Sequence, residues 1–116
     1  MYQVYAERAL RLIEGKLSGA CSLSMLCREL GVIVKRVEGS ALSKGYVTLL
    51  HGTAYILLHS NQTLQEKRVT LAHELAHLLL GHVGDWYGII GRDLPQEEQE
   101  READRLATLI LGKFYD

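Results

Sequence analysis

This chain of 116 residues has few cysteines, and only one proline, one tryptophan and one phenylalanine. Cys21 and Cys27 are too few for the disulfide framework of a small secreted domain. Their C-x5-C spacing is also a poor match to a zinc site, so we expect buried or half-buried thiols. The single proline argues against a linker between domains. We therefore expect one domain over residues 1–116.

A strong charge of one sign and long apolar segments are missing too. The formal net charge of −1 gives no electrostatic basis for binding nucleic acid or an anionic membrane. No apolar run approaches the roughly 20 residues that a membrane-spanning helix needs. The first apolar stretch contains Glu7, Arg8 and Arg11, which interrupt the apolar core that a signal peptide requires. We expect a cytoplasmic protein.

The most informative feature that is present is the run His73-Glu74-Leu75-Ala76-His77. Residues four apart on a helix lie one above the other, so both imidazoles can bind one Zn²⁺ at about 2.0–2.1 Å. Glu74 projects about 100° around the helix from His73, which suits a general base acting on a metal-bound water better than a third ligand. The alternative is two core histidines bonded to backbone carbonyls. Zinc is the better explanation.

The residues around this run predict a buried helix. Thr63 can cap its start, with Glu66 as the partner in a capping box, and Gly81 can end it. His82 lies about 500° around the helix from His77. We therefore expect His82 to be a cation near the negative end of the helix dipole and not a ligand. Apolar residues, which would cover most of the circumference, are Val69, Leu71, Ala72, Leu75, Ala76, Leu78, Leu79 and Leu80.

A third ligand is expected from a second helix over residues 95–112. Glu100 borders the apolar face of this helix and can point inward as the third zinc ligand. Asp104, one turn later, can accept a hydrogen bond from the free N–H of a zinc-bound histidine and fix its tautomer. Glu102 is the main rival, since it borders the same face from the opposite side. We favour Glu100, because only Glu100 has an aspartate four residues later. The other competitors, expected in a solvated acidic first turn, are Glu97 and Glu98.

The earlier part of the chain predicts helices followed by a small sheet. Apolar residues at helical spacing indicate helices over 2–13 and 22–30, the second capped by Ser22. Strands are predicted at 32–37, 46–50 and 53–59, with a tight turn at His51-Gly52 between the last two. The order ααβββαα indicates an α+β domain whose three-stranded sheet packs on the helix that carries the histidines. Which strand forms an edge stays open.

At this point the chain resembles a known family. The run His73-Glu74-x-x-His77 followed by Glu100-x-x-x-Asp104 looks like the gluzincin arrangement of zinc peptidases. More narrowly, residues 68–82 are similar to the active helix of the ImmA/IrrE family of metallopeptidases, and residues 100–107 match its second motif. In that family position 104 is usually Asn, and an aromatic residue often stands in place of Leu106. The resemblance implies a minimal zincin-like domain with one zinc ion per chain.

The family resemblance also implies a function. His73, His77 and Glu100 would hold Zn²⁺, and Glu74 would take a proton from the bound water and pass it to the leaving amine. One strand of the predicted hairpin over 46–59 would form the upper rim of the cleft and bind the substrate; the alternative is that the hairpin only covers the core. The substrate would be a protein or peptide, namely a helix-turn-helix repressor of a mobile element or stress response, carried on a separate chain. Candidates for stabilising the oxyanion are Tyr87, His82, Tyr115 and His59.

A different class of function is also open. The domain could bind zinc and a partner without hydrolysis, as a regulatory or interaction component of a toxin–antitoxin system or a phage element. The short stretch that follows the second motif favours this alternative. Glu74 argues against it, because binding alone needs no base at that position.

Overall fold

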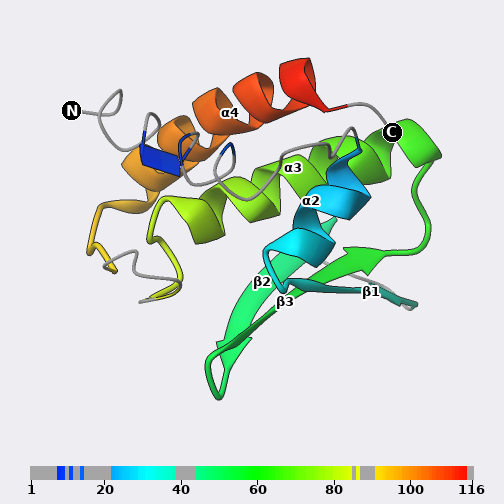
Figure 1. Ribbon diagram of the computed structural model, residues 1–116, viewed down its shortest axis with the longest axis horizontal. Helices are drawn as coiled ribbons and strands as arrows, with labels where there is room; N and C mark the ends of the chain where they lie inside the picture. The colour runs from blue at the N-terminus through cyan, green and yellow to red at the C-terminus, as the bar shows by residue number, and fades with distance from the viewer. Residues whose placement is uncertain are drawn as a thin grey trace.

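The α+β architecture is confirmed. The computed structural model describes residues 8, 9, 11, 14, 22–38, 44–84, 86 and 91–114, and the helix predicted over 2–13 lies largely outside them. Figure 1 shows α3 between the sheet and α4. The elements, in chain order, are α2 (Leu23–Glu29), β1 (Ile33–Val37), β2 (Gly45–Leu50), β3 (Thr53–His59), α3 (Leu64–Leu79) and α4 (Gln96–Lys113).

The sheet is mixed, with strand order β1-β3-β2. β1 runs parallel to the central strand β3, and β2 runs antiparallel to it. His51 and Gly52 both have positive φ, at 51° and 80°, which is the backbone conformation that tight hairpin turns favour. Because β3 is the central strand, both β1 and β2 are edges of the sheet among the described residues. The sequence left this point open.

The core extends from the sheet through α3 to α4. β3 alternates, so that Ala54, Ile56 and Leu58 are buried while the residues between them are half-buried. This period of two is that of a strand with one face on a core. The largest fully buried side chains of α3 and α4 belong to the same core cluster. They are Leu75, Leu78, Leu106 and Ile110.

The start of α3 follows the predicted capping box. Thr63 Oγ1 accepts a hydrogen bond from the backbone N of Glu66 at 3.1 Å, and Thr63 N donates to Glu66 Oε1 at 2.8 Å. Gly81, with φ of 78°, follows the C-cap Leu80. One expected core position is wrong, because Val69 is 44% exposed. The bounds of α3 place the two histidines in its C-terminal half.

Gln62 joins three elements around the start of β2. Its side-chain amide donates to the carbonyl of Lys44, just before β2, at 2.9 Å, and to the carbonyl of His59, at the end of β3, at 2.8 Å. Its amide oxygen accepts from Thr70 Oγ1, on α3, at 2.9 Å. The first residues of β2 are thus held against the middle of α3, where the histidine motif begins.

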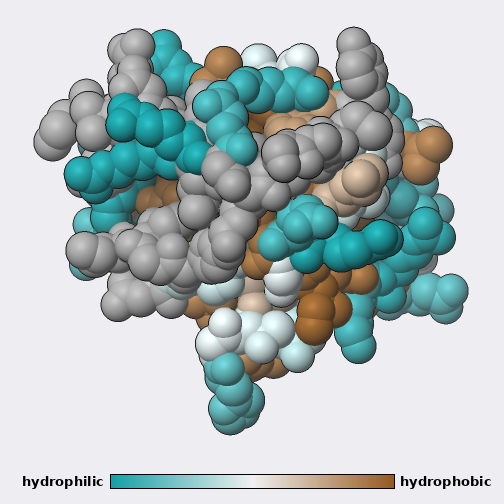
Figure 2. Space-filling model, viewed as in Figure 1, coloured by the Kyte–Doolittle hydropathy of each residue, from teal (hydrophilic) through white to brown (hydrophobic). Residues whose placement is uncertain are grey.

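Apolar side chains also reach the surface. Figure 2 shows them between polar residues in the lower half of the face turned to the viewer. A groove of about 770 Å³ opens between α2, β1 and the N-terminal half of α3, and none of the predicted site residues lines it. Within the described residues, no helix has the length and apolar character to cross a membrane. The apolar lining of the groove is Leu23, Val34, Leu58, Leu64 and Leu71.

Candidate metal centre

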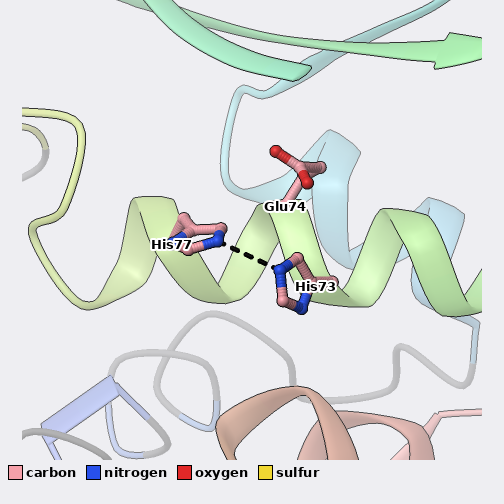
Figure 3. A group of neighbouring side chains, drawn as sticks. All are labelled: His73, Glu74 and His77. Carbon is pink, nitrogen blue, oxygen red and sulfur yellow. Dashed lines mark hydrogen bonds between the residues drawn. The ribbon is translucent and has the colours of Figure 1, made fainter. Parts of the chain in front are cut away.

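The two histidines of the motif face one another on α3. Figure 3 shows their rings turned together along the helix, while Glu74 points to the side of α3 that faces the sheet. His73 Nε2 lies 3.1 Å from His77 Nε2, and the ring planes are inclined by 84°. The side chains are 23% and 12% exposed. Their neighbours Ala72 and Ala76 are fully buried, which fixes the helix face that carries them.

Glu100 reaches the same point from α4. Its Oε1 lies 3.3 Å from His73 Nε2, and its Oε2 lies 2.7 Å from His77 Nε2. A tetrahedral Zn²⁺ with bonds of about 2.0–2.1 Å separates its ligand atoms by about 3.3 Å. Two imidazoles and one carboxylate at this spacing therefore fit a single zinc ion. The structure brings the three predicted ligands together, and their metal-binding role stays a prediction.

Asp104 lies against the far side of His73. Its Oδ1 is 3.0 Å from His73 Nδ1, although the aspartate side chain is 73% exposed. A carboxylate only accepts hydrogen bonds, so this contact favours the neutral form of His73 that carries its proton on Nδ1. The unprotonated Nε2 then faces His77 and Glu100. This is the orientation that a metal ligand needs.

His82 was expected to be a helix-end cation rotated off the face of the ligands, and that placement is wrong. Its side chain is 1% exposed, with Nδ1 2.9 Å from His77 Nδ1 and Nε2 2.7 Å from Glu102 Oε1. The prediction assumed that helical geometry continues to residue 82. Instead the chain turns at Gly81, and the backbone N of His82 donates to the carbonyl of His77. The turn brings the ring back beside the motif.

Glu102, the rival ligand, faces elsewhere. Its side chain is 2% exposed and contacts His82 and the guanidinium of Arg92. Arg92 Nη1 donates to Glu102 Oε2 at 3.1 Å, and its Nη2 contacts Oε1. These bonds occupy both carboxylate oxygens. No signal in the sequence singled out Arg92, because it lies in the segment before α4 and meets Glu102 only through the tertiary fold.

Glu74 completes the group of residues in this centre. One of its oxygens lies with ring nitrogens of His73 and His77 in a set of atoms all within 4.8 Å of one another. Gly45, at the start of β2, packs on it: a Cβ there would stand 3.2 Å from Glu74 Cγ and 2.5 Å from Thr70 Cγ2. Gly45 could not be predicted from the sequence, because its role depends on how closely β2 approaches α3.

The family assignment agrees with this geometry. A family model described as the IrrE N-terminal-like domain, from a family of peptidases, matches residues 27–111. The chain belongs to the ImmA/IrrE family. The match includes every residue of the candidate centre and identifies a metallopeptidase-like domain. No curated protein and no solved structure matches the chain significantly.

Burial sets the protonation of this ImmA/IrrE centre. It raises the pKa of Glu74; the charge of His73 lowers that pKa and the charge of Glu100 raises it further. Burial lowers the pKa of His77 to about 4, although Glu100 opposes the shift. His77 is therefore neutral near pH 7, as a metal ligand must be. Glu74 gains basicity, which suits a residue that accepts a proton.

The outer residues of the centre show similar effects. Burial lowers the pKa of His82, although the hydrogen bond with Glu102 raises it. For Glu102, burial raises the pKa, but hydrogen bonds from Arg92 and His82 outweigh burial and leave the pKa below its ordinary value. Glu102 is thus a carboxylate beside a neutral imidazole at pH 7.

Of the four expected oxyanion donors, the structure of this ImmA/IrrE domain describes only His59 and His82. Tyr87 and Tyr115 lie outside the described residues. His59 Nδ1 accepts a hydrogen bond from Asn61 N at 3.1 Å, within the turn that follows β3. The ring of His82 is buried against Glu102, so it does not face a substrate. The role of oxyanion donor stays a prediction without an assigned residue.

Proposed function

We propose that this ImmA/IrrE-family domain is a zinc-dependent metallopeptidase that cleaves a protein substrate in the cytoplasm. The observation that carries the proposal is the approach of Glu100 to Nε2 of both His73 and His77, at 3.3 and 2.7 Å. The half-buried Glu74 stands beside this ligand set. A site that only held zinc would need no carboxylate of raised pKa next to it.

Several residues of the chain would have separate roles in peptide hydrolysis. When bound, zinc acidifies a water molecule and polarises the scissile carbonyl. Glu74 would accept a proton from the attacking water and pass it to the nitrogen of the leaving amine. Its burial keeps the carboxyl basic enough for the first transfer, and Gly45 leaves room for its side chain. Asp104 holds the ring of His73 through Nδ1.

β2 supports substrate binding beside Glu74. It is an edge of the sheet, its first residue packs on Glu74, and it pairs only with β3 among the described residues. An extended peptide can add to such an edge through backbone hydrogen bonds, while side-chain pockets provide selectivity. The substrate backbone would then run along β2 with its scissile bond near Glu74.

A separate helix-turn-helix repressor is the substrate that the family resemblance favours. The named elements before α3 are α2 and the three strands, and the net charge of −1 gives no basis for direct binding to nucleic acid. DNA recognition would therefore belong to the substrate. Cleavage would remove the repressor from its operator in a mobile element or a stress response.

The test is cleavage of a candidate repressor, produced in the same cells as this chain. We expect wild type to cleave it and Glu74→Gln to lose roughly 10²–10⁴-fold of the rate, with zinc retained. Glu97→Gln is the matched control, because its side chain is 91% exposed on α4. Cleavage that is undiminished in Glu74→Gln contradicts the proposal. Stable binding without cleavage by the zinc-loaded wild type favours the non-catalytic regulatory role.

A further inference from the structure

A series of hydrogen-bonded side chains leads from His77 away from the proposed zinc position. His77 Nδ1 meets His82 Nδ1 at 2.9 Å, and His82 Nε2 meets Glu102 Oε1 at 2.7 Å. His82 and Glu102 are 1% and 2% exposed. Their hydrogen bonds therefore face no competition from solvent. The mechanism described above uses neither residue.

The positions of the protons in this series follow from its acidic end. Glu102 is a carboxylate and can only accept, so His82 Nε2 must carry a proton and donate. A neutral His82 then has a lone pair on Nδ1, which can only accept. His77 must therefore donate through its Nδ1–H, and its lone pair is on Nε2, facing His73 and Glu100. The contact of Arg92 Nη2 with His82 Nε2, at 3.4 Å, does not compete, because the carboxylate is far closer.

Arg92 fixes the acidic end of the series. It contacts both oxygens of Glu102, a two-point geometry that holds a carboxylate in one orientation. Its Nε also donates to the carbonyl of Leu80, at 2.9 Å, and its backbone N to the carbonyl of Gly81, at 2.9 Å. Arg92 thus joins the end of α3 to Glu102 on α4. Its positive charge balances Glu102, so His82 can stay neutral.

We propose that His82, Glu102 and Arg92, here called the support network, are positioning residues that hold His77 in the Nδ1–H tautomer. In that tautomer His77 presents Nε2 to the metal. The support network thus influences zinc affinity although His82, which contacts His77, does not itself bind the metal. In the opposite tautomer of His77, its Nδ1 and the Nδ1 of His82 would both carry lone pairs. The two atoms would then face one another with no hydrogen-bond donor between them. The inference rests on the zinc site of the proposed function.

The tautomer can be measured on the wild-type chain. Long-range ¹H–¹⁵N spectra of the imidazoles in the zinc-free, ¹⁵N-labelled full chain distinguish the two neutral forms of each ring. We expect His77 as Nδ1–H and His82 as Nε2–H above pH 7. Neutral histidine in water favours Nε2–H, so a ring that is merely buried has no reason to adopt the form expected for His77. An Nε2–H signal for His77 overturns the proposal.

Zinc affinity tests the same inference in variants. In competition with a chromogenic chelator, His82→Phe should weaken zinc binding roughly 10–100-fold, as loss of such outer partners typically does. His82→Asn can place an amide oxygen near the former Nδ1, and we expect it to restore affinity to within a few-fold of wild type. Glu97→Gln serves as the control. Wild-type zinc affinity in a folded His82→Phe overturns the proposal, and the wild-type spectra decide it if that variant does not fold.

Neither measurement depends on peptide cleavage. A chain with the expected tautomer and zinc affinity that cleaves no substrate would contradict the proposed function and leave the role of the support network intact. A chain that cleaves its substrate while His77 carries its proton on Nε2 in the zinc-free state would contradict the support network alone. The two failures are therefore distinguishable.

Discussion

Glu100 Oε2 lies 2.7 Å from His77 Nε2, across the interface between α4 and α3. The two residues belong to different helices, so this contact exists only when the helices pack in their native arrangement. The same carboxylate reaches His73 through its other oxygen. The geometry of the centre is therefore a property of the helix pair and not of the histidine motif alone.

Replacing Glu100 by alanine should remove most of the bound zinc. The variant keeps both imidazoles but lacks the carboxylate that approaches each Nε2. We expect close to one equivalent of zinc in dialysed wild type and a small fraction of that in Glu100→Ala, measured by elemental analysis. Glu97→Ala should resemble wild type, since Glu97 is exposed. Retention of one equivalent in Glu100→Ala would exclude Glu100 as a ligand.

Asp104 should act through its contact with His73 Nδ1. Asp104→Ala removes the acceptor 3.0 Å from His73 Nδ1, and we expect zinc affinity to fall by about 10-fold, the lower end of the usual range because water can reach this exposed site. Asp104→Asn keeps an oxygen acceptor and should stay within a few-fold of wild type. Chelator competition measures both. Equal losses in the two variants would show that charge, not the hydrogen bond, matters.

Gly45→Ala should destabilise the domain. The added Cβ would stand 2.5 Å from Thr70 Cγ2 and 3.2 Å from Glu74 Cγ, and overpacking of this kind typically costs about 1–3 kcal/mol. Urea unfolding measures the loss. Gly112→Ala is the matched control, because a Cβ on that glycine of α4 has no atom within 4 Å. The control should gain up to about 1 kcal/mol from helix propensity. Equal stability of Gly45→Ala and wild type would contradict the close approach of β2 to α3.

The stability of the zinc-free domain should fall with acid because of His77. Burial lowers its pKa from 6.5 to about 4 in the folded state. Between these values the unfolded chain binds a proton that the folded chain does not, so stability decreases as pH falls through this window. Denaturant unfolding over a pH series should show a smaller decrease in His77→Gln. Glu74 has the opposite sign, since its pKa is raised, so only this comparison isolates His77. An unchanged profile in the variant would contradict the shift.

Most of the fold could be predicted because local rules determine its elements. Ser22 and Thr63 cap their helices, because each side-chain oxygen accepts a hydrogen bond from the backbone N–H three residues later, at Met25 and Glu66. The motif on α3 needs only helical spacing to bring His73 and His77 together. Glu100 could be proposed because its helix has one apolar face, which must turn toward the core. Each of these inferences uses contacts within a single element.

The inferences that failed or were missed depend on contacts between elements. His82 follows a turn at Gly81, so extrapolating the helix placed its ring on the wrong side. Glu102 became buried because Arg92, from a separate segment, neutralises it. The tight approach of Gly45 to α3 depends on how β2 pairs with β3. Nothing in the local pattern of any of these residues encodes its partner.

Because the proposed zinc ligands lie on both α3 and α4, zinc binding would be coupled to folding. An ion bound only by the native helix pair adds RT ln(1 + [L]/Kd) to the free energy of unfolding, about 2.7 kcal/mol at one hundred times Kd. That is a large fraction of the stability of an ordinary small domain. The resistance of this chain to proteolysis would then increase with the concentration of free zinc. Depletion of zinc would shorten the lifetime of the protein as well as remove the proposed activity.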